Sequence, residues 1–287
     1  MKRRAMRLVC GGVLVLAVAT AWVHARQAVV PETVLFTPDV VYSTVEGTAL
    51  KLDLARPKTG DGPFPIIVCI HGGGWQAGSR ADFRALILGL AQQGYAAASV
   101  QYRLAPQHRF PAQYDDVKAA VAALRTRAGE WKLDPDRVAV LGGSAGGHLA
   151  LMLATDPSLK IKAAVSMAGP TDLTRVFPEA TDQIVRELVG PEAAHPAEVR
   201  RQASPIHRIG PGTAPILMIH GDQDEIVPYD QSVTLQDACR KAGLEAELIT
   251  IKGGKHGGGG SAEDNGAAIL KALEFLRGRL AKPQPTS

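Results

Sequence analysis

Short apolar runs alternate with stretches of helical periodicity through most of the chain. Each run is almost continuously apolar, as is typical of strands that are buried on both faces of a parallel sheet. Between the runs, apolar residues recur at helical spacing, first at 117, 120, 121 and 124 and again from 269 to 280. The alternation predicts a single doubly wound α/β domain with a mostly parallel sheet. The expected strands are residues 66–70, 96–100, 138–141, 161–167, 216–220 and 247–251.

The segment before the first buried run has a different pattern. Residues 40–45 and 50–54 alternate between apolar and polar side chains, and a Glu46-Gly47 turn separates them. Alternation of this kind around a tight turn predicts a β-hairpin. We therefore expect an N-terminal hairpin to precede the parallel part of the sheet.

A second break in the pattern runs from about residue 170 to 213. This stretch holds prolines, charged residues and one short helical pattern near residues 184–189, but no buried strand. Long connections within a compact domain are usually functional. We expect residues 170–213 to form a small lid insertion.

The first 25 residues have the three parts of a secretory signal. Four basic residues within the first seven are followed by an apolar stretch at residues 8–21 and a small-residue cleavage site, Val23-His24-Ala25. The apolar stretch is too short to span a bilayer of about 30 Å comfortably. We therefore expect export to the periplasm or the medium, with residues 26–287 as a single mature domain. Retention of the segment as a membrane anchor is the alternative.

The net charge of +4 comes entirely from this leader, because residues 1–25 carry four basic and no acidic side chains. The remaining chain is neutral overall and offers no electrostatic case for a nucleic-acid partner. Cleavage would leave Cys69 and Cys239, and no Cys/His cluster has zinc spacing. Cys69 lies in an apolar run and is expected to be a small buried hydrophobe rather than half of a disulfide.

Residues 142–146 (GGSAG) fit the G-x-S-x-G pattern. They directly follow an expected strand and precede a run, residues 148–154, that is compatible with a helix. In this context the flanking glycines permit a strained turn that lifts a serine hydroxyl out of the sheet. Ser144 is therefore the candidate nucleophile, and a glycine-rich strand-to-helix turn without catalytic function is the alternative.

A serine nucleophile needs a base, and the base needs a carboxylate that orients it. In the strand–turn–helix arrangement these residues follow the serine in the order acid, then histidine. The segment after the expected strand 216–220 contains Asp222, Asp224 and Glu225, and only His256 follows it. We predict Asp224 as the acid, because Asp222 adjoins the strand end and is better placed to stabilise the turn.

Residues 71–75 (HGGGW) follow the expected strand 66–70. Three consecutive glycines let a backbone approach a substrate closely with its N–H groups directed inward. This is an HGGG-type oxyanion loop, whose donors act together with the N–H of the residue after the nucleophile, Ala145. Trp75 is the candidate wall of the substrate pocket, with a core aromatic as the alternative.

Four ordered motifs together resemble the hormone-sensitive-lipase-like and feruloyl/acetyl-xylan-esterase-like branch of the α/β-hydrolases. The resemblance extends over residues 40–280 and implies a serine esterase with Ser144, Asp224 and His256 in the triad positions. It also places the oxyanion donors at Gly73, Gly74 and Ala145. The four motifs are HGGGW at 71–75, YRLAP at 102–106, FPA at 110–112 and GGSAGGH at 142–148.

These residues predict an exported carboxylic-ester hydrolase that needs no metal or organic cofactor. We expect short acyl esters, because the lid candidate is rich in charge and proline. The resemblance and the expected export imply acetyl or feruloyl groups on carbohydrate as candidate substrates. Four glycines after His256 are expected to loosen that loop. The DEIVP segment at 224–228 also resembles prolyl-oligopeptidase-type enzymes, so a serine peptidase is an alternative. A non-catalytic binding module on the same fold is another.

Overall fold

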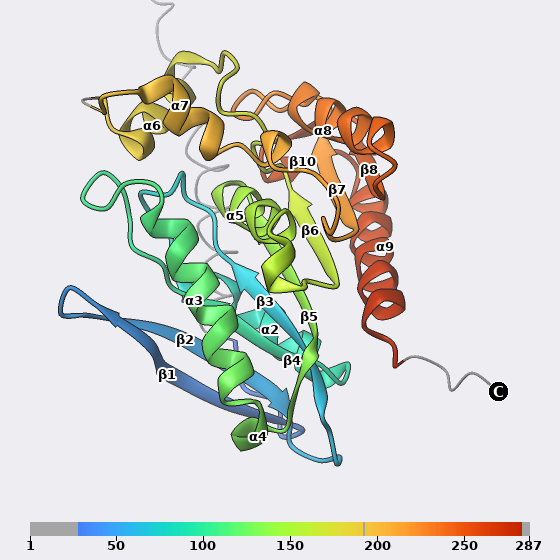
Figure 1. The fold of residues 1–287 in the computed structure, drawn as a ribbon. Coiled ribbons are helices and arrows are strands. Elements are labelled where there is room, and N and C mark those ends of the chain that lie inside the picture. Colours follow the sequence, from blue (N-terminus) through green and yellow to red (C-terminus); the bar gives the residue numbers. More distant parts are fainter. Residues whose placement is uncertain (1–27, 192, 283–287) are drawn as a thin grey trace, which may run out of the picture.

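The computed structural model describes residues 28–191 and 193–282, so the predicted signal at residues 1–25 lies outside the described residues. Eight strands form one sheet in the order β1-β2-β4-β3-β5-β6-β7-β8 (Figure 1). The first two pairings, β1 with β2 and β2 with β4, are antiparallel, and the other strands are parallel. The prediction of a mostly parallel sheet is thereby confirmed. The strands of this sheet are β1 (Val34–Val45), β2 (Thr48–Pro57), β3 (Phe64–Ile70), β4 (Ala96–Val100), β5 (Leu133–Gly143), β6 (Ala163–Met167), β7 (Ile216–Gly221) and β8 (Ala246–Ile251).

The N-terminal hairpin predicted from alternation is β1 with β2, and it lies at the edge of the sheet (Figure 1). Both strands are longer than the alternating segments suggested. Glu46 and Gly47 form the turn, each with a positive φ (51° and 77°). The expectation of a hairpin before the parallel strands is confirmed.

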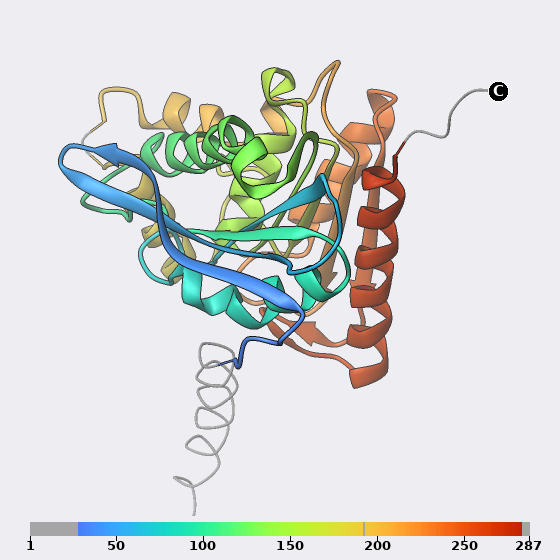
Figure 2. The ribbon, with the colours of Figure 1, turned by 90° about the horizontal axis from the view of Figure 1, so that it is seen from below.

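Helices cover both faces of the sheet, with α3 and α5 above it and α2 below it in Figure 2. Successive residues of β3 pack in two different hydrophobic cores, one on each face of the sheet. Ile66, Val68 and Ile70 pack in the core beneath α3 and α5, whereas Ile67 and Cys69 pack in the core beneath α2 and α9. The helices are α2 (Arg84–Gln92), α3 (Ala112–Thr126), α4 (Ala128–Trp131), α5 (Ala145–Ala154), α6 (Glu179–Val189), α7 (Pro196–Gln202), α8 (Asp230–Lys241) and α9 (Ala262–Leu280).

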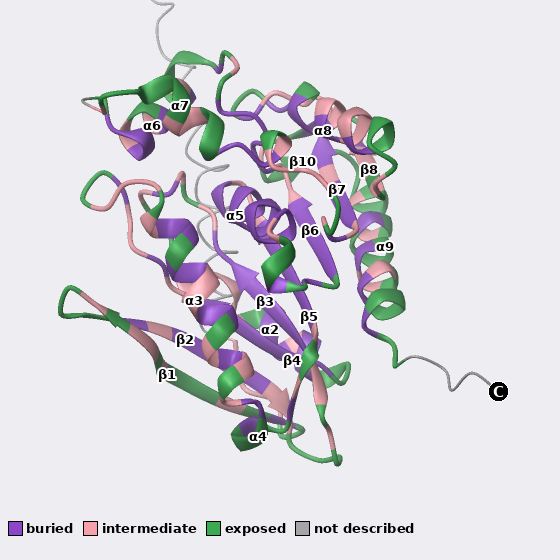
Figure 3. Ribbon diagram, in the orientation of Figure 1, coloured by how far each residue is buried: buried purple, intermediate pink, exposed green. Residues whose placement is uncertain are grey.

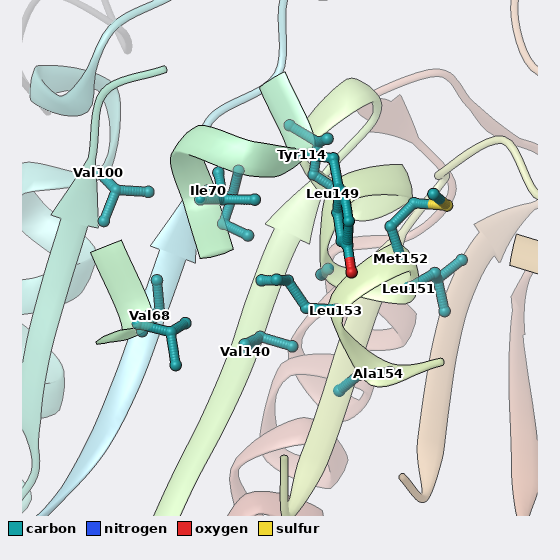
Figure 4. Close-up of a cluster of buried hydrophobic side chains, with 14 of the residues drawn as sticks. Val68, Ile70, Val100, Tyr114, Val140, Leu149, Leu151, Met152, Leu153 and Ala154 are labelled. Carbon is teal, nitrogen blue, oxygen red and sulfur yellow. The ribbon is translucent and has the colours of Figure 1, made fainter. Parts of the chain in front are cut away.

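Burial on both faces explains why the parallel strands are continuously apolar rather than alternating. Every residue of β4 is buried, and the central strands are purple along most of their length in Figure 3. In the close-up of Figure 4, Val140 of β5 lies beside Leu153 of α5, and Val68 of the neighbouring strand β3 belongs to the same core. Cys69 is buried with a free thiol, as expected for a small hydrophobe, and Cys239 is also buried and free.

The carboxyl ends of the parallel strands lie at one edge of the sheet. Ile70 pairs with Gly142 across β3 and β5, and Gly143 pairs with Met167 across β5 and β6. Gly221 pairs with Ile251 across β7 and β8. Because the loops that leave these ends share one edge, residues far apart in the sequence can meet there.

The segment expected to form a lid contains two α-helices, α6 and α7, where the sequence showed one short helical pattern. Val185, Leu188 and Val189 give α6 an apolar face that is buried in the core. The opposite face carries charge, with Arg186 joined to Asp182 at 2.7 Å. Among the described residues, no helix combines the length and apolar character that crossing a membrane requires.

Candidate active site

Ser144 occupies a sharp turn between β5 and α5. Its backbone has φ 53° and ψ −122°, a conformation that a non-glycine residue adopts only where its surroundings hold it. Its N–H donates to the carbonyl of Met167 at 2.7 Å, and its own carbonyl accepts from His148 N–H at 3.0 Å. These bonds tie the turn to β6 and to the first turn of α5, so the serine is held in its strained conformation.

The glycines that flank Ser144 are required by close packing. A Cβ at Gly146 would collide with the carbonyl oxygen of Ile70, and one at Gly142 would collide with the carbonyl oxygen of Gly146. The start of α5 therefore lies directly against the end of β3. The glycines of the G-x-S-x-G pattern act here through the absence of a side chain as well as through the turn.

The structure brings Ser144, His256 and Asp224 together in one chain of hydrogen bonds. His256 Nε2 lies 2.9 Å from Ser144 Oγ, and His256 Nδ1 lies 2.8 Å from Asp224 Oδ2. In the tautomer that fits both contacts, Nδ1–H donates to the carboxylate and Nε2 accepts from the serine hydroxyl. The arrangement can therefore remove the proton of Ser144 and stabilise the imidazolium that results.

Asp224 is buried and receives several hydrogen bonds. Its Oδ1 accepts from the N–H groups of Ile226 and Val227, both at 2.9 Å, and its Oδ2 lies 3.1 Å from His220 Nε2. Burial alone would raise the pKa of Asp224. The bonds from His220, His256 and the two N–H groups outweigh burial and hold this pKa well below its usual range. The side chain is therefore a carboxylate at neutral pH.

Asp222, the competing acid, lies elsewhere. Its Oδ1 accepts from Gly253 N–H at 2.7 Å, and its Oδ2 lies 3.2 Å from Lys252 Nζ. It stabilises the turn after β8 rather than the turn after β7, the strand that it adjoins. The hydrogen bond to His256 belongs to Asp224.

The loop of residues 71–75 lies beside Ser144. A Cβ at Gly72 would be 2.9 Å from the carbonyl oxygen of Gly143 and 3.4 Å from Ser144 Cβ. Gly73 and Gly74 have φ values of 104° and 58°, and a side chain at Gly73 would also collide with the carbonyl of Ala77. A side chain cannot be accommodated at Gly73, and the N–H groups of Gly73 and Gly74, with that of Ala145, are suited to bind an oxyanion.

Trp75 does not occupy the position expected of a pocket wall. Its side chain is only 2% exposed, and it packs in the core beneath α3 and α5. Its Nε1–H donates to His148 Nδ1 at 3.2 Å. The alternative of a core aromatic is therefore the better description, because a buried indole needs a hydrogen-bond partner and His148 supplies one.

Helix α6 lies over the loop of residues 71–75. Gln76 Nε2 donates to Glu187 Oε2 at 2.7 Å, and a Cβ at Gly74 would be 3.1 Å from Ile184 Cγ2. The same helix reaches the acid loop, where Thr181 Oγ1 donates to the carbonyl of Ile226 at 2.9 Å. The lid segment thus contacts two of the loops that form the site.

The glycines after His256 form a defined structure rather than a loose loop. Strands β9 (Gly254–Lys255) and β10 (Gly258–Gly259) pair as a short antiparallel ribbon. Asn265 Nδ2 donates to the carbonyl of Gly259 at 2.9 Å. Gly257, which has a positive φ, lies with His256 in the tight turn between these two strands.

Two histidines in the site were not predicted from the sequence. His220 is buried at the end of β7, between Asp224 and Ser232, whose Oγ lies 2.8 Å from His220 Nδ1. His148 is buried on α5. The available signals were a histidine four residues before the acid and another four residues after the nucleophile.

Comparison with known proteins shows the family of this chain. The BD-FAE family profile matches residues 52–239, which is more than half of the chain. The chain belongs to the BD-FAE family. The predicted resemblance to the esterase branch of the α/β-hydrolases is thereby confirmed.

Relatives of this BD-FAE chain are named as esterases. Esterase LipC of Mycobacterium tuberculosis is 33% identical over 214 residues, which cover 68% of this chain and 53% of LipC. Ethyl acetate hydrolase of Pseudomonas putida is 29% identical over 76% of this chain and 74% of its own length. The chain spans about half the length of LipC and of several other curated relatives that it matches.

Solved structures of esterases share the fold. A truncated carbohydrate esterase from gut microbiota has a TM-score of 0.76 and 26% identity, covering 86% of this chain and 97% of its own. Esterase 2 of Thermogutta terrifontis, phosphonylated by sarin, has a TM-score of 0.76 and 29% identity, covering 89% and 99%. The chain therefore has an α/β-hydrolase fold similar to those of solved esterases.

Proposed function

We propose that the protein is a serine carboxylesterase that acts through an acyl-enzyme intermediate. The observation that carries this proposal is the continuous hydrogen-bond chain from Ser144 Oγ through His256 to Asp224. It is supported by the names of its relatives and by the Thermogutta esterase that sarin phosphonylates, since the phosphorus of such a reagent is attacked by a nucleophile. No metal or organic cofactor is needed for this chemistry.

In the proposed reaction, Ser144 Oγ attacks the ester carbonyl carbon while its proton moves to His256 Nε2. The carbonyl oxygen becomes an oxyanion that accepts hydrogen bonds from the N–H groups of Gly73, Gly74 and Ala145. When the intermediate collapses, the C–O bond breaks and His256 returns the proton to the leaving alcohol. A water molecule then repeats the sequence on the acyl-enzyme, releasing the carboxylic acid and restoring Ser144.

The substrate that we propose is a short-chain ester, including acetyl groups on carbohydrate. The buried apolar face of α6 faces the core and cannot line an acyl tunnel. With Trp75 also buried, Ile184 is the side chain best placed to limit the acyl group, because it lies against Gly74. The names ethyl acetate hydrolase and carbohydrate esterase support small acyl groups and sugar alcohols respectively.

A panel of p-nitrophenyl esters tests the acyl limit. Each methylene buried in an open pocket is worth about 0.8 kcal/mol, so a lipase-like site would raise kcat/KM roughly fourfold per carbon. We expect kcat/KM to rise only between acetate and butyrate and then to fall for octanoate and palmitate. In the same assay a proline p-nitroanilide should not be cleaved. Its cleavage would indicate a peptidase rather than an esterase.

A pair of matched variants tests whether Ile184 limits the length of the acyl chain. Ile184→Ala should extend the preferred chain toward octanoate, whereas Ile269→Ala, a change at an exposed residue of α9, should leave the profile unchanged. A higher kcat/KM for octanoate or palmitate than for butyrate in the parent enzyme would contradict the short-chain proposal.

We also propose that the protein is exported and cleaved after Ala25. Intact-mass analysis of protein from the periplasm or medium of a bacterial host should show Arg26 as the first residue. Ala25→Phe should block cleavage, because the processing site requires a small side chain. A chain that retains Met1 in the membrane fraction would support an anchor instead.

A further inference from the structure

Trp75 follows the glycines of the oxyanion loop and has a left-handed backbone, with φ 59°. A bulky aromatic residue rarely adopts this conformation and keeps it only where its surroundings hold it in place. Two contacts do so. The carbonyl of Trp75 accepts from Ala105 N–H at 2.8 Å, and its indole N–H donates to His148 Nδ1 at 3.2 Å.

The tautomer of His148 is determined by its two contacts. His148 Nε2 lies 2.6 Å from the carbonyl oxygen of Ala203, which can only accept, so Nε2 carries the proton. Nδ1 therefore presents a lone pair to the indole N–H of Trp75. Burial lowers the pKa of His148 to about 4, which keeps the imidazole neutral at physiological pH.

These contacts join three parts of the site. Trp75 belongs to the oxyanion loop, His148 to the helix that follows the nucleophile, and Ala203 to the end of the lid segment after α7. All three residues are buried, and the two rings meet edge to face with centroids 5.1 Å apart. The contact between Trp75 and His148 thus connects the loop of residues 71–75 to the helix that follows Ser144.

We propose that His148 is a positioning residue of the esterase reaction, which holds the oxyanion loop in register with Ser144 through Trp75. This inference rests on the proposed serine esterase function. If the link is lost, Gly73 and Gly74 can move relative to Ser144 while the triad stays intact. A displacement of about 1 Å in a catalytic group can cost on the order of 10²-fold in rate.

Three substitutions distinguish a positioning role of the Trp75–His148 hydrogen bond from a contribution of the two side chains to packing alone. Trp75→Phe removes the indole N–H and keeps an aromatic ring. His148→Gln places its amide near the position of Nε2, so it can still reach Ala203 but loses the acceptor for Trp75. His148→Asn places its carbonyl oxygen near Nδ1, so it keeps that acceptor and loses the contact with Ala203.

We expect Trp75→Phe and His148→Gln to lower kcat for p-nitrophenyl acetate by about 10- to 100-fold, with KM within about threefold. The double variant Trp75→Phe/His148→Gln should be no slower than the slower single variant, because both substitutions remove the same hydrogen bond. His148→Asn should retain kcat within about threefold. The inhibition constant of a trifluoromethyl ketone, whose adduct carries an oxyanion, should rise as kcat/KM falls.

The proposal is overturned if Trp75→Phe keeps the parent kcat, or if His148→Asn loses as much kcat as His148→Gln. Thermal unfolding of each variant checks the fold, and Trp75→Phe with the ketone decides the question if a His148 variant does not fold. Ser144→Ala separates the two levels of the proposal. If that variant is inactive and Trp75→Phe is normal, only the positioning role fails, whereas an active Ser144→Ala removes the esterase mechanism itself.

Discussion

Ser144→Ala should reduce kcat for p-nitrophenyl acetate by about 10⁶-fold. Loss of the nucleophile from a comparable triad has an effect of this size, and the residual rate reflects binding and the oxyanion donors. The fold should be retained, because alanine removes only Oγ, whose hydrogen bond is to His256 Nε2. The measurement is steady-state ester turnover together with thermal unfolding of the parent and the variant.

A control serine sharpens this experiment. Ser158 is exposed and bonds to Asp156 at the surface, so Ser158→Ala should leave turnover unchanged. Stoichiometric labelling by an organophosphonate should disappear in Ser144→Ala and persist in Ser158→Ala. If Ser144→Ala kept a tenth of the parent rate, another residue would have to attack the ester.

Asp224→Asn should lower kcat by about 10⁴-fold, the effect of the same change in a well-studied triad. The amide cannot stabilise the imidazolium as a carboxylate does, and its NH₂ group can hold His256 in the wrong tautomer. The loss should appear in kcat with a small change in KM, because Asp224 is buried behind His256 and does not face the substrate.

Asp222→Asn is the matched control, since it makes the same chemical change two residues away. Asp222 bonds to Lys252 and to the N–H of Gly253, and Lys252 is largely exposed. We expect kcat and KM of this variant to stay within about threefold of the parent values. Comparable losses in both variants would show that the carboxylates act through the loop rather than through His256.

Local sequence patterns predicted the strands of the sheet and the turn that carries Ser144. The apolar runs indicated strands buried on both faces, and each became a strand of the sheet because burial is decided largely by side-chain character along a short segment. The G-x-S-x-G turn could also be predicted, since a strand, two flanking glycines and a helix are adjacent in the chain. The order acid then histidine left only His256 as a base.

The tertiary structure decided what depends on contacts between distant segments. The sequence favoured Asp224 over Asp222 only by its distance from the strand end. The structure shows the contacts themselves, with Asp224 bonded to His256 and Asp222 bonded to Gly253 after β8. Trp75 could be a pocket wall or a core residue until His148, 73 residues away, was found beneath it. The contact of Glu187 with Gln76 likewise required the lid to be folded over the loop.

The sequence by itself therefore determined the strands, the turn that carries Ser144 and the types of side chain available at the carboxyl edge of the sheet. Which aromatic is buried and which helix covers the loop of residues 71–75 were decided only in three dimensions. The physical reason is range: propensity and burial patterns act over a few residues, whereas a hydrogen bond selects one partner within about 3 Å from any part of the chain.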